Sequence, residues 1–226
     1  MEKNYLIKKR KKLIEVSIPL ENINSASAAE LQPGIGPHPR GLHKWWARRP
    51  LASARAVLFC QLVDDPSDLE DELPTEKEQN KERERLFAII KELVLWKNSK
   101  NERILNLCRA EIQKSWIRCC KDNANHPEAN DMFNPKKIPD FHDPFAGGGA
   151  LPIEAQRLGL RTFASDLNPI AVLINKSTID IPQRFASLSP VNSDFKNEKL
   201  LIKSDYKNGS GLVQDISYYG NWINEE

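Results

Sequence analysis

The chain has 226 residues, of which 40% are hydrophobic and 28% are charged, and its formal net charge is +2 at pH 7. These are ordinary values for a soluble globular protein with a core of its own. No apolar run approaches the ~20 residues that a membrane-spanning helix needs, and no apolar stretch of signal-peptide type follows the basic N-terminus. Both of those classes are excluded, which favours a cytoplasmic protein without membrane contact.

Basic residues form two groups near the N-terminus. Residues 8–12 read KKRKK, and a second group lies between Arg40 and Arg55. We expect residues 1–12 to be a basic, disordered tail. Both groups could meet phosphates. The residues for which we predict DNA contacts are Lys8, Lys9, Arg10, Arg48 and Arg49. The alternative is a solvated tail and a solvated helix face.

Residues 13–65 are expected to form an N-terminal segment that ends in a helix. Near its start Ile14, Val16 and Ile18 alternate with other residues over one strand length, which predicts a short extended segment.

The run LHKWWARRP follows a stiff loop rich in proline and glycine. Trp45 and Trp46 stand between cations, a pattern that suits stacking on bases or clamping an anion. The alternative is that the two rings anchor the loop into the core while the cations point outward. Pro50 is expected to open a helix, and apolar residues at helical spacing predict an amphipathic helix from Leu51 to Val63.

Residues 66–138 are expected to form a helical insertion. Two capping boxes, which begin at Thr75 and at Ser99, precede apolar residues at helical spacing. They predict an antiparallel helix pair over residues 76–97 and 101–120, followed by a polar loop. We expect its charged outer face to be a solvated surface, with a lid or a partner-docking insertion as the alternatives.

The chain has four cysteines, and none has the CxxC spacing of a zinc site. We therefore predict free, mostly buried thiols in a reducing compartment and no metal.

Residues 139–226 begin with the stretch HDPFAGGGALPIEAQRLGLRTFASDLNP. It predicts a strand, a glycine loop, a helix and a second strand, in this order: 138–142, 147–149, 151–158 and 160–165. Gly159 suits the end of the helix. Asn168 and Pro169 are expected to cap and open the next helix. Further on, residues 200–202 predict a short strand, and the terminal YYGNW a helix beginning.

Two acids define the ligand that this stretch predicts. Asp166 stands at the tip of the second strand, where an acid can accept both hydrogen bonds of a ribose diol. The loop lacks the G-x-G-x-x-G pattern of a pyrophosphate site. Asp143 at its entrance would repel phosphate but attract an ammonium or sulfonium group. The pattern therefore favours S-adenosylmethionine over NAD. It predicts an α/β, Rossmann-like S-adenosylmethionine-dependent methyltransferase fold with an incomplete sheet.

DPFAGGG followed by SDLNP resembles the cofactor motifs of amino-group DNA methyltransferases, whose usual form is D-P-F-x-G-x-G. In addition, LIEVSIPL, GLHKWWARRPLASARAVL and the glycine loop are similar to the N-terminal domain of unknown function in bacterial and archaeal adenine-specific DNA methylases, some of which carry a zinc ribbon. The resemblance covers most of residues 13–182 and the terminal YYGNW.

The resemblance implies roles for single residues. Those that would line the methionine end of the cofactor are Asp143, Pro144, Phe145, Ala146, Gly147 and Gly149. Asp166 would take the ribose hydroxyls and Leu167 would pack on the adenine. His43 and Lys44 would flank the cofactor carboxylate.

Amino methyltransferases also carry a catalytic [DNS]-P-P-[YFW] tetrapeptide that receives a flipped base, and this sequence contains none. We expect it downstream of residue 226. The chain would then be an inactive N-terminal fragment or a truncated product, with a split enzyme as the alternative. The resemblance implies methylation of adenine in DNA, in restriction or phage defence. It also implies DNA, a catalytic half or defence-system proteins as partners.

Two other functions remain open. RNA guanine N2-methyltransferases also use DPFxGxG followed by Ile-Glu-Ala, as in residues 153–155. The missing tetrapeptide also suits a non-catalytic module that binds cofactor or DNA.

Overall fold

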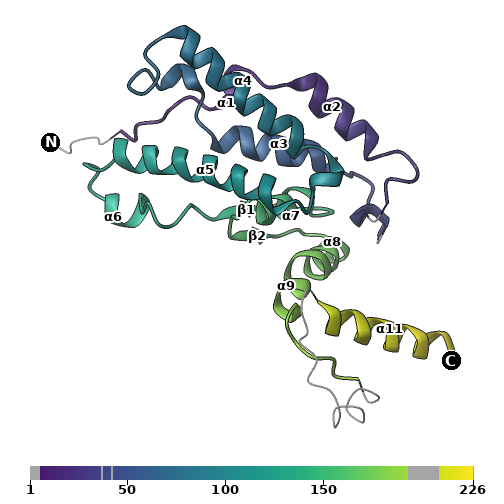
Figure 1. Cartoon of the computed structure of the whole chain (residues 1–226). Helices are drawn as coiled ribbons and strands as arrows, with labels where there is room; N and C mark the ends of the chain where they lie inside the picture. Colours follow the sequence, from purple (N-terminus) through teal and green to yellow (C-terminus); the bar gives the residue numbers. More distant parts are fainter. Residues whose placement is uncertain (1–5, 37, 42, 193–208, 226) are drawn as a thin grey trace. The chain divides into compact units, whose positions relative to one another are not determined.

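The structure, a computed structural model, describes residues 6–36, 38–41, 43–192 and 209–225 (Figure 1). The chain divides into two compact units, Met1–Asp166 and Leu167–Glu226. The residues on both sides of position 138 belong to the first of these units. The strand expected at residues 200–202 lies outside the described residues.

The first unit is mostly helical. Its α-helices are α1 (Leu13–Val16), α2 (Leu20–Ala29), α3 (Leu51–Leu62), α4 (Glu76–Leu93), α5 (Glu102–Asp122), α6 (Ala129–Met132) and α7 (Ala150–Arg157). Its 3₁₀ turns are η1 (Pro39–Gly41), η2 (Pro66–Asp68) and η3 (Trp96–Asn98). Its strands are β1 (Phe141–Asp143) and β2 (Thr162–Ala164).

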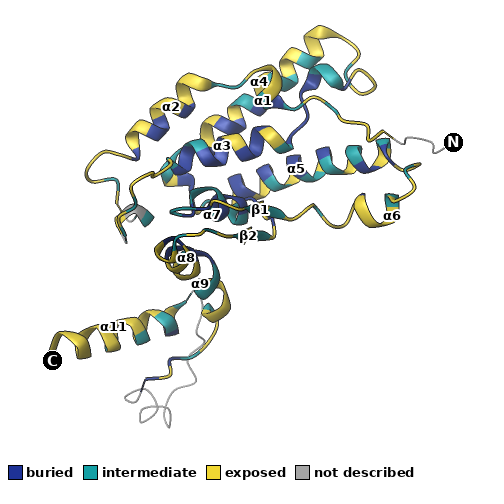
Figure 2. Cartoon of the chain, turned by 180° about the vertical axis from the view of Figure 1, so that it is seen from behind, coloured by how far each residue is buried: buried dark blue, intermediate teal, exposed yellow. Residues whose placement is uncertain are grey.

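Helix α3 lies in the middle of this unit and packs against α1, α2, α4, α5 and α7 (Figures 1 and 2). The helix is confirmed, but it is buried more completely than an amphipathic helix. Small alanines on several sides let neighbouring helices approach, and even the charged Arg55 is only 1% exposed. Pro50 is the N-cap rather than the first helical residue.

The predicted helix pair is confirmed as α4 and α5, which pack against each other. Thr75 and Glu78 form the predicted capping box. The second box is wrong, because Asn101 is the N-cap of α5 and its side chain accepts a hydrogen bond from Arg103 N. Ser99 instead closes the preceding 3₁₀ turn, η3.

The N-terminal residues differ from the sequence prediction in two ways. The extended segment at residues 14–18 is wrong, since α1 forms there with Leu13 fully buried and Leu13 N bonded to Val63 O. The disordered tail is wrong for residues 6–12. Lys12 pairs with Asp64 in an antiparallel bridge, and Lys8 N donates to the side chain of Asn123.

Strand β1, helix α7 and strand β2 follow one another as predicted. The strands pair in parallel, with Phe141 opposite Thr162 and Asp143 opposite Ala164. Helix α7 packs on both strands and on α3. Gly159 follows the helix with φ at 88°, the left-handed conformation that glycine adopts easily. In the described part of the chain the sheet has two strands, so the fold is helix-rich with a small parallel sheet.

The secondary structure in the described part of the second unit is helical, with loop residues between the helices. It contains α8 (Pro169–Asn175), a π-helical turn η4 (Lys176–Asp180), α9 (Ile181–Phe185) and α11 (Ser210–Glu225). Asn168 caps α8 as predicted, because its side chain accepts from Ile170 N at 2.9 Å. Helix α11 packs on α9. Asp215 on α11 accepts hydrogen bonds from the backbone of Val191 and Asn192.

Candidate cofactor site

The loop after β1 is held by the two acids that the sequence singled out. The carboxylate of Asp143 accepts a hydrogen bond from Phe145 N at 3.1 Å. The carboxylate of Asp166 accepts one from Gly147 N at 2.8 Å. Since β1 and β2 are parallel neighbours, their carboxyl ends bring both acids to one edge of the sheet, the edge where open α/β sheets bind ligands.

Glycine fits the positions of this loop for two different reasons, backbone conformation and close packing. Gly147 and Gly149 have positive φ, 49° and 76°, which other residues adopt at a cost. Gly149 is also the N-cap of α7. A Cβ on Gly147 would lie 2.9 Å from Trp45 Nε1, and one on Gly148 would lie 3.2 Å from the same ring. The ring of Trp45 therefore covers this side of the loop.

The two tryptophans thus differ. Trp45 packs against the glycine loop, as the anchoring alternative predicts, whereas Trp46 is 83% exposed. Their rings meet edge to face with centroids 5.2 Å apart. Of the two, Trp46 has the exposed ring face that stacking on a base requires.

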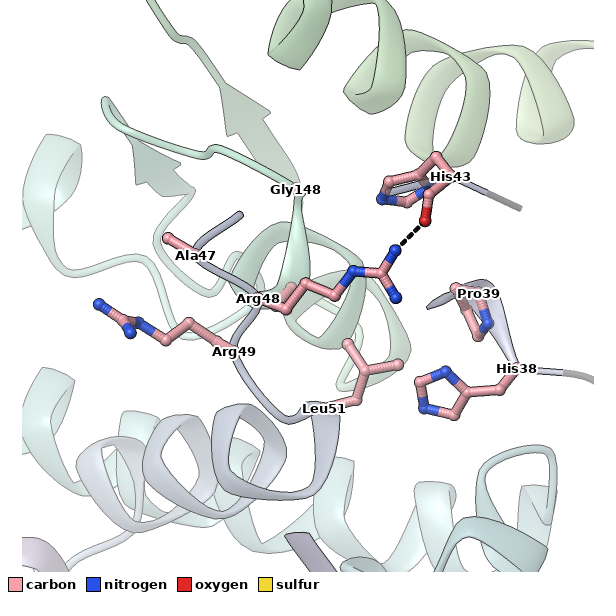
Figure 3. Close-up of a pocket in the computed structure, with 9 residues that line it drawn as sticks. His38, Pro39, His43, Ala47, Arg48, Arg49, Leu51 and Gly148 are labelled. Atoms are coloured by element: carbon pink, nitrogen blue, oxygen red, sulfur yellow. Dashed lines mark hydrogen bonds between the residues drawn. The ribbon is translucent and has the colours of Figure 1, made fainter. Parts of the chain in front are cut away.

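A pocket lies beside the N-terminus of α7 (Figure 3). Its lining residues are His38, Pro39, His43, Ala47, Arg48, Arg49, Leu51, Gly148 and Ala150. The Arg48 guanidinium donates to the carbonyl oxygen of His43, whereas the Arg49 side chain points away from it. The pKa of His43 lies below its usual value, because burial and the nearby Arg48 both disfavour the charged ring. Arg48 therefore places a permanent positive charge in the lining of the pocket.

The predicted cofactor residues fall in different places. Lys44 is exposed and lies outside the residues that line the pocket, while His43 is in the lining. The sequence predicted a DNA contact for Arg48 but not its position in the lining of this pocket. Phe145 is 78% exposed and Leu167, the first residue of the second unit, is 95% exposed. Pro144 is exposed as well, and Ala146 is buried, with its N–H bonded to Ser165 O.

Arg10, for which the sequence predicts a DNA contact, pairs with acids of the same chain. Its guanidinium pairs with Asp122 at 2.5 Å and with Asp71 at 3.2 Å, so it ties the N-terminal residues to acids of the same chain. Lys8 and Lys9 are exposed.

The Glu of the Ile-Glu-Ala sequence is structural. Glu154 is fully buried and its carboxylate lies 3.0 Å from Arg55 Nε. The ion pair with Arg55 therefore accounts for a charged residue at this core position. The sequence did not predict that Arg55 and Glu154 form a pair. No local sequence pattern shows that two charges far apart in the chain meet in a core.

Among the described residues, no three His, Cys, Asp or Glu side chains gather so that they could hold a metal ion. The cysteines are free thiols, and burial raises the pKa of Cys60 and of Cys108 to about 12. No helix in the described ranges is both long and apolar enough to cross a bilayer.

Two protein-family models match the chain. Residues 17–89 match "Protein of unknown function (DUF1156)", and residues 126–208 match "D12 class N6 adenine-specific DNA methyltransferase". The predicted family resemblance is confirmed. The DUF1156 segment, residues 17–89, holds Trp45 and α3. The D12 segment, residues 126–208, holds the glycine loop and both acids. No curated protein and no solved structure matches the chain.

Proposed function

We propose that this chain is the S-adenosylmethionine-binding portion of an adenine-specific DNA methyltransferase. The D12 match supports a role related to DNA adenine methylation and implies a methyl donor of the S-adenosylmethionine type. In this proposal β1, α7 and β2 are the first strand–helix–strand element of a Rossmann-like sheet. The observation that carries it is the pair Asp143 and Asp166 at the carboxyl ends of neighbouring parallel strands, each bonded to an N–H of the glycine loop.

The residues around the loop fit the groups of this cofactor. Asp143 supplies negative charge for the amine and the sulfonium, and Asp166 supplies an acceptor for the ribose hydroxyls. Arg48 and the N-terminal end of α7 supply positive charge for the carboxylate. Exposed Phe145 is apolar surface for the adenine. When bound, S-adenosylmethionine supplies an electrophilic methyl group, and the residues of this chain hold and orient it.

No residue of this chain is assigned to receive the target amine, since the sequence has no [DNS]-P-P-[YFW] tetrapeptide. We therefore expect residues 1–226 alone to bind the cofactor without methylating DNA. Methyl incorporation into adenine by this chain alone would contradict that expectation.

Titration calorimetry with S-adenosylmethionine tests the binding. The wild-type chain is expected to release or take up heat on binding, and Asp166→Ala is expected to bind at least about tenfold more weakly, because one hydrogen bond to a charged group is worth ~1.5–3 kcal/mol. The matched control is Asp131→Ala, at an exposed acid away from the loop. No detectable heat from a folded wild-type chain would overturn the proposal.

DNA contact is proposed for Lys8, Lys9 and Arg49, which are exposed cations. Binding through phosphates weakens steeply with salt, so Arg49→Ala should lower the DNA affinity and flatten the salt dependence. Arg10→Ala is the comparison, because Arg10 already pairs with acids of the chain. DNA binding that does not respond to salt would contradict the assignment.

A further inference from the structure

The DUF1156 segment contacts the glycine loop directly through Trp45. Cβ atoms placed on Gly147 and Gly148 would lie 2.9 and 3.2 Å from the ring, closer than a side chain can normally approach. Because the two glycines have no side chains, the ring of Trp45 can pack directly on the loop. Gly147 is also the residue whose N–H bonds to Asp166, so the ring packs on the part of the loop that is bonded to the candidate ribose acceptor.

A second contact joins the same segment to α7. Arg55 on α3 places Nε 3.0 Å from Glu154 Oε2 and Nη2 3.0 Å from Glu30 Oε1. It also donates to the carbonyl oxygen of Leu93 at 3.0 Å. Glu30 in turn accepts from Leu51 N at 2.8 Å. One buried arginine thus connects the end of α2, the ends of α3 and α4, and the middle of α7.

Arg157 completes this buried cluster from α7. It lies 3.1 Å from the second oxygen of Glu154. The guanidinium carbons of Arg55 and Arg157 lie 5.8 and 5.5 Å from the centre of the Trp96 ring. Glu30 also lies 3.7 Å from His38 Nε2, and His38 lines the pocket beside the loop. The cluster therefore extends from the core to the wall of the candidate site.

Buried ion pairs are a costly way to gain stability, because desolvation offsets the attraction. A buried ion pair does, however, limit how the two helices that carry it can turn, because separating the charges leaves both without a partner. The ion pair of Arg55 and Glu154 joins α3 to α7 in this way, and α7 begins at the glycine loop.

We infer that the DUF1156 segment positions the glycine loop of the methyltransferase. Trp45 packs on the loop and restricts its movement, and Arg55 orients α7 through Glu154, so both are positioning residues. The consequence for the cofactor rests on the proposed function, whereas the order of the loop can be measured without any cofactor.

Hydrogen exchange of the full chain tests the contact of Trp45. In Trp45→Ala the N–H groups of Ala146, Gly147 and Gly149 are expected to exchange at least about tenfold faster, while the amides of α4 and α5 are unchanged. Trp46→Ala is the matched control and should leave the loop unchanged, since that ring is exposed. S-adenosylmethionine should then bind Trp45→Ala about tenfold more weakly.

Glu154→Gln tests the contact with α7. Amides of α7 are expected to exchange about tenfold faster in this variant. Glu84→Gln, at an exposed position of α4, is the control and should change nothing.

The outcomes separate the two proposals. Loop and α7 amides that exchange as in the wild type in both variants would overturn the positioning role, even if the cofactor binds. Weaker cofactor binding by Trp45→Ala with unchanged exchange would also overturn it, because the ring would then act by touching the ligand. Faster exchange in a protein that does not bind the cofactor would support positioning and would contradict only the proposed function.

Discussion

Two groups of ion pairs hold the first unit together, and they differ in their exposure to water. Arg10 joins the N-terminal residues to Asp122 and Asp71 with partly exposed side chains. Arg55 joins Glu30 and Glu154 with all three side chains at 2% exposure or less. Water screens the first group, so its pairs contribute little each. In the second group every charge depends on its partner, which makes that cluster the more sensitive part of the fold.

The largest expected effect comes from removing the shared cation. Arg55→Met leaves buried Glu30 without its arginine and buried Glu154 with Arg157 alone. Breaking a buried pair by removing one partner costs about 3–5 kcal/mol of the free energy of unfolding. Urea denaturation measures it. Arg85→Met is the control, because Arg85 is 40% exposed in its pairs with Glu82 and Glu111, and it should cost about 1 kcal/mol or less. Equal losses in the two variants would remove the distinction between the groups.

The next effect is a dependence on pH that belongs to Glu154. Burial raises the pKa of Glu154 from 4.5 to about 7. Between these values the unfolded chain has lost the proton that the folded chain keeps, so this group lowers the stability as the pH rises through that window. The unfolding free energy of the wild type minus that of Glu154→Gln should therefore fall by about 2 kcal/mol from pH 5 to pH 7.

Urea denaturation of both proteins at several pH values measures this difference. Exposed acids cancel in the comparison, because they are the same in the two chains. A difference that stays constant from pH 5 to pH 7 would show that Glu154 is ionised in the fold throughout.

The smallest effect is expected for the surface group. Arg10→Ala should lower the free energy of unfolding by about 1 kcal/mol at low salt. The loss should diminish in high salt, where exposed charges are screened. In the wild type, Arg10 holds the pKa of Asp122 below its usual value, mainly through their hydrogen bond. A loss as large as that of Arg55→Met would contradict the contrast between the groups.

Local patterns explain how much the sequence could predict. The order β1, α7, β2, the caps at Thr75 and Asn168, and the helix pair depend on residues a few positions apart, and the structure has them. The acids of the site follow from the same logic, because Asp143 and Asp166 each stand at a predicted strand end. Apolar spacing also located α3.

What could not be predicted involves residues far apart in the sequence. Nothing near Trp45 shows that its ring lies on Gly147, and a charge pattern cannot tell Arg55 from a solvated arginine. The KKRKK run predicts either a solvated tail or a phosphate-binding group. The acids that pair with Arg10 lie in two later segments of the chain, which the run itself does not indicate. The helix α1 forms because burial of Leu13 outweighs the alternating pattern that follows it.

The central claim is that the loop between Asp143 and Asp166 binds S-adenosylmethionine. Hydrogen exchange of the wild-type chain with and without saturating cofactor tests it most directly. We expect bound cofactor to slow the exchange of the N–H groups of Phe145, Gly147 and Gly149 and to leave the exchange of the amides of α4 and α5 unchanged. Identical exchange of these loop amides in the two samples would contradict the claim.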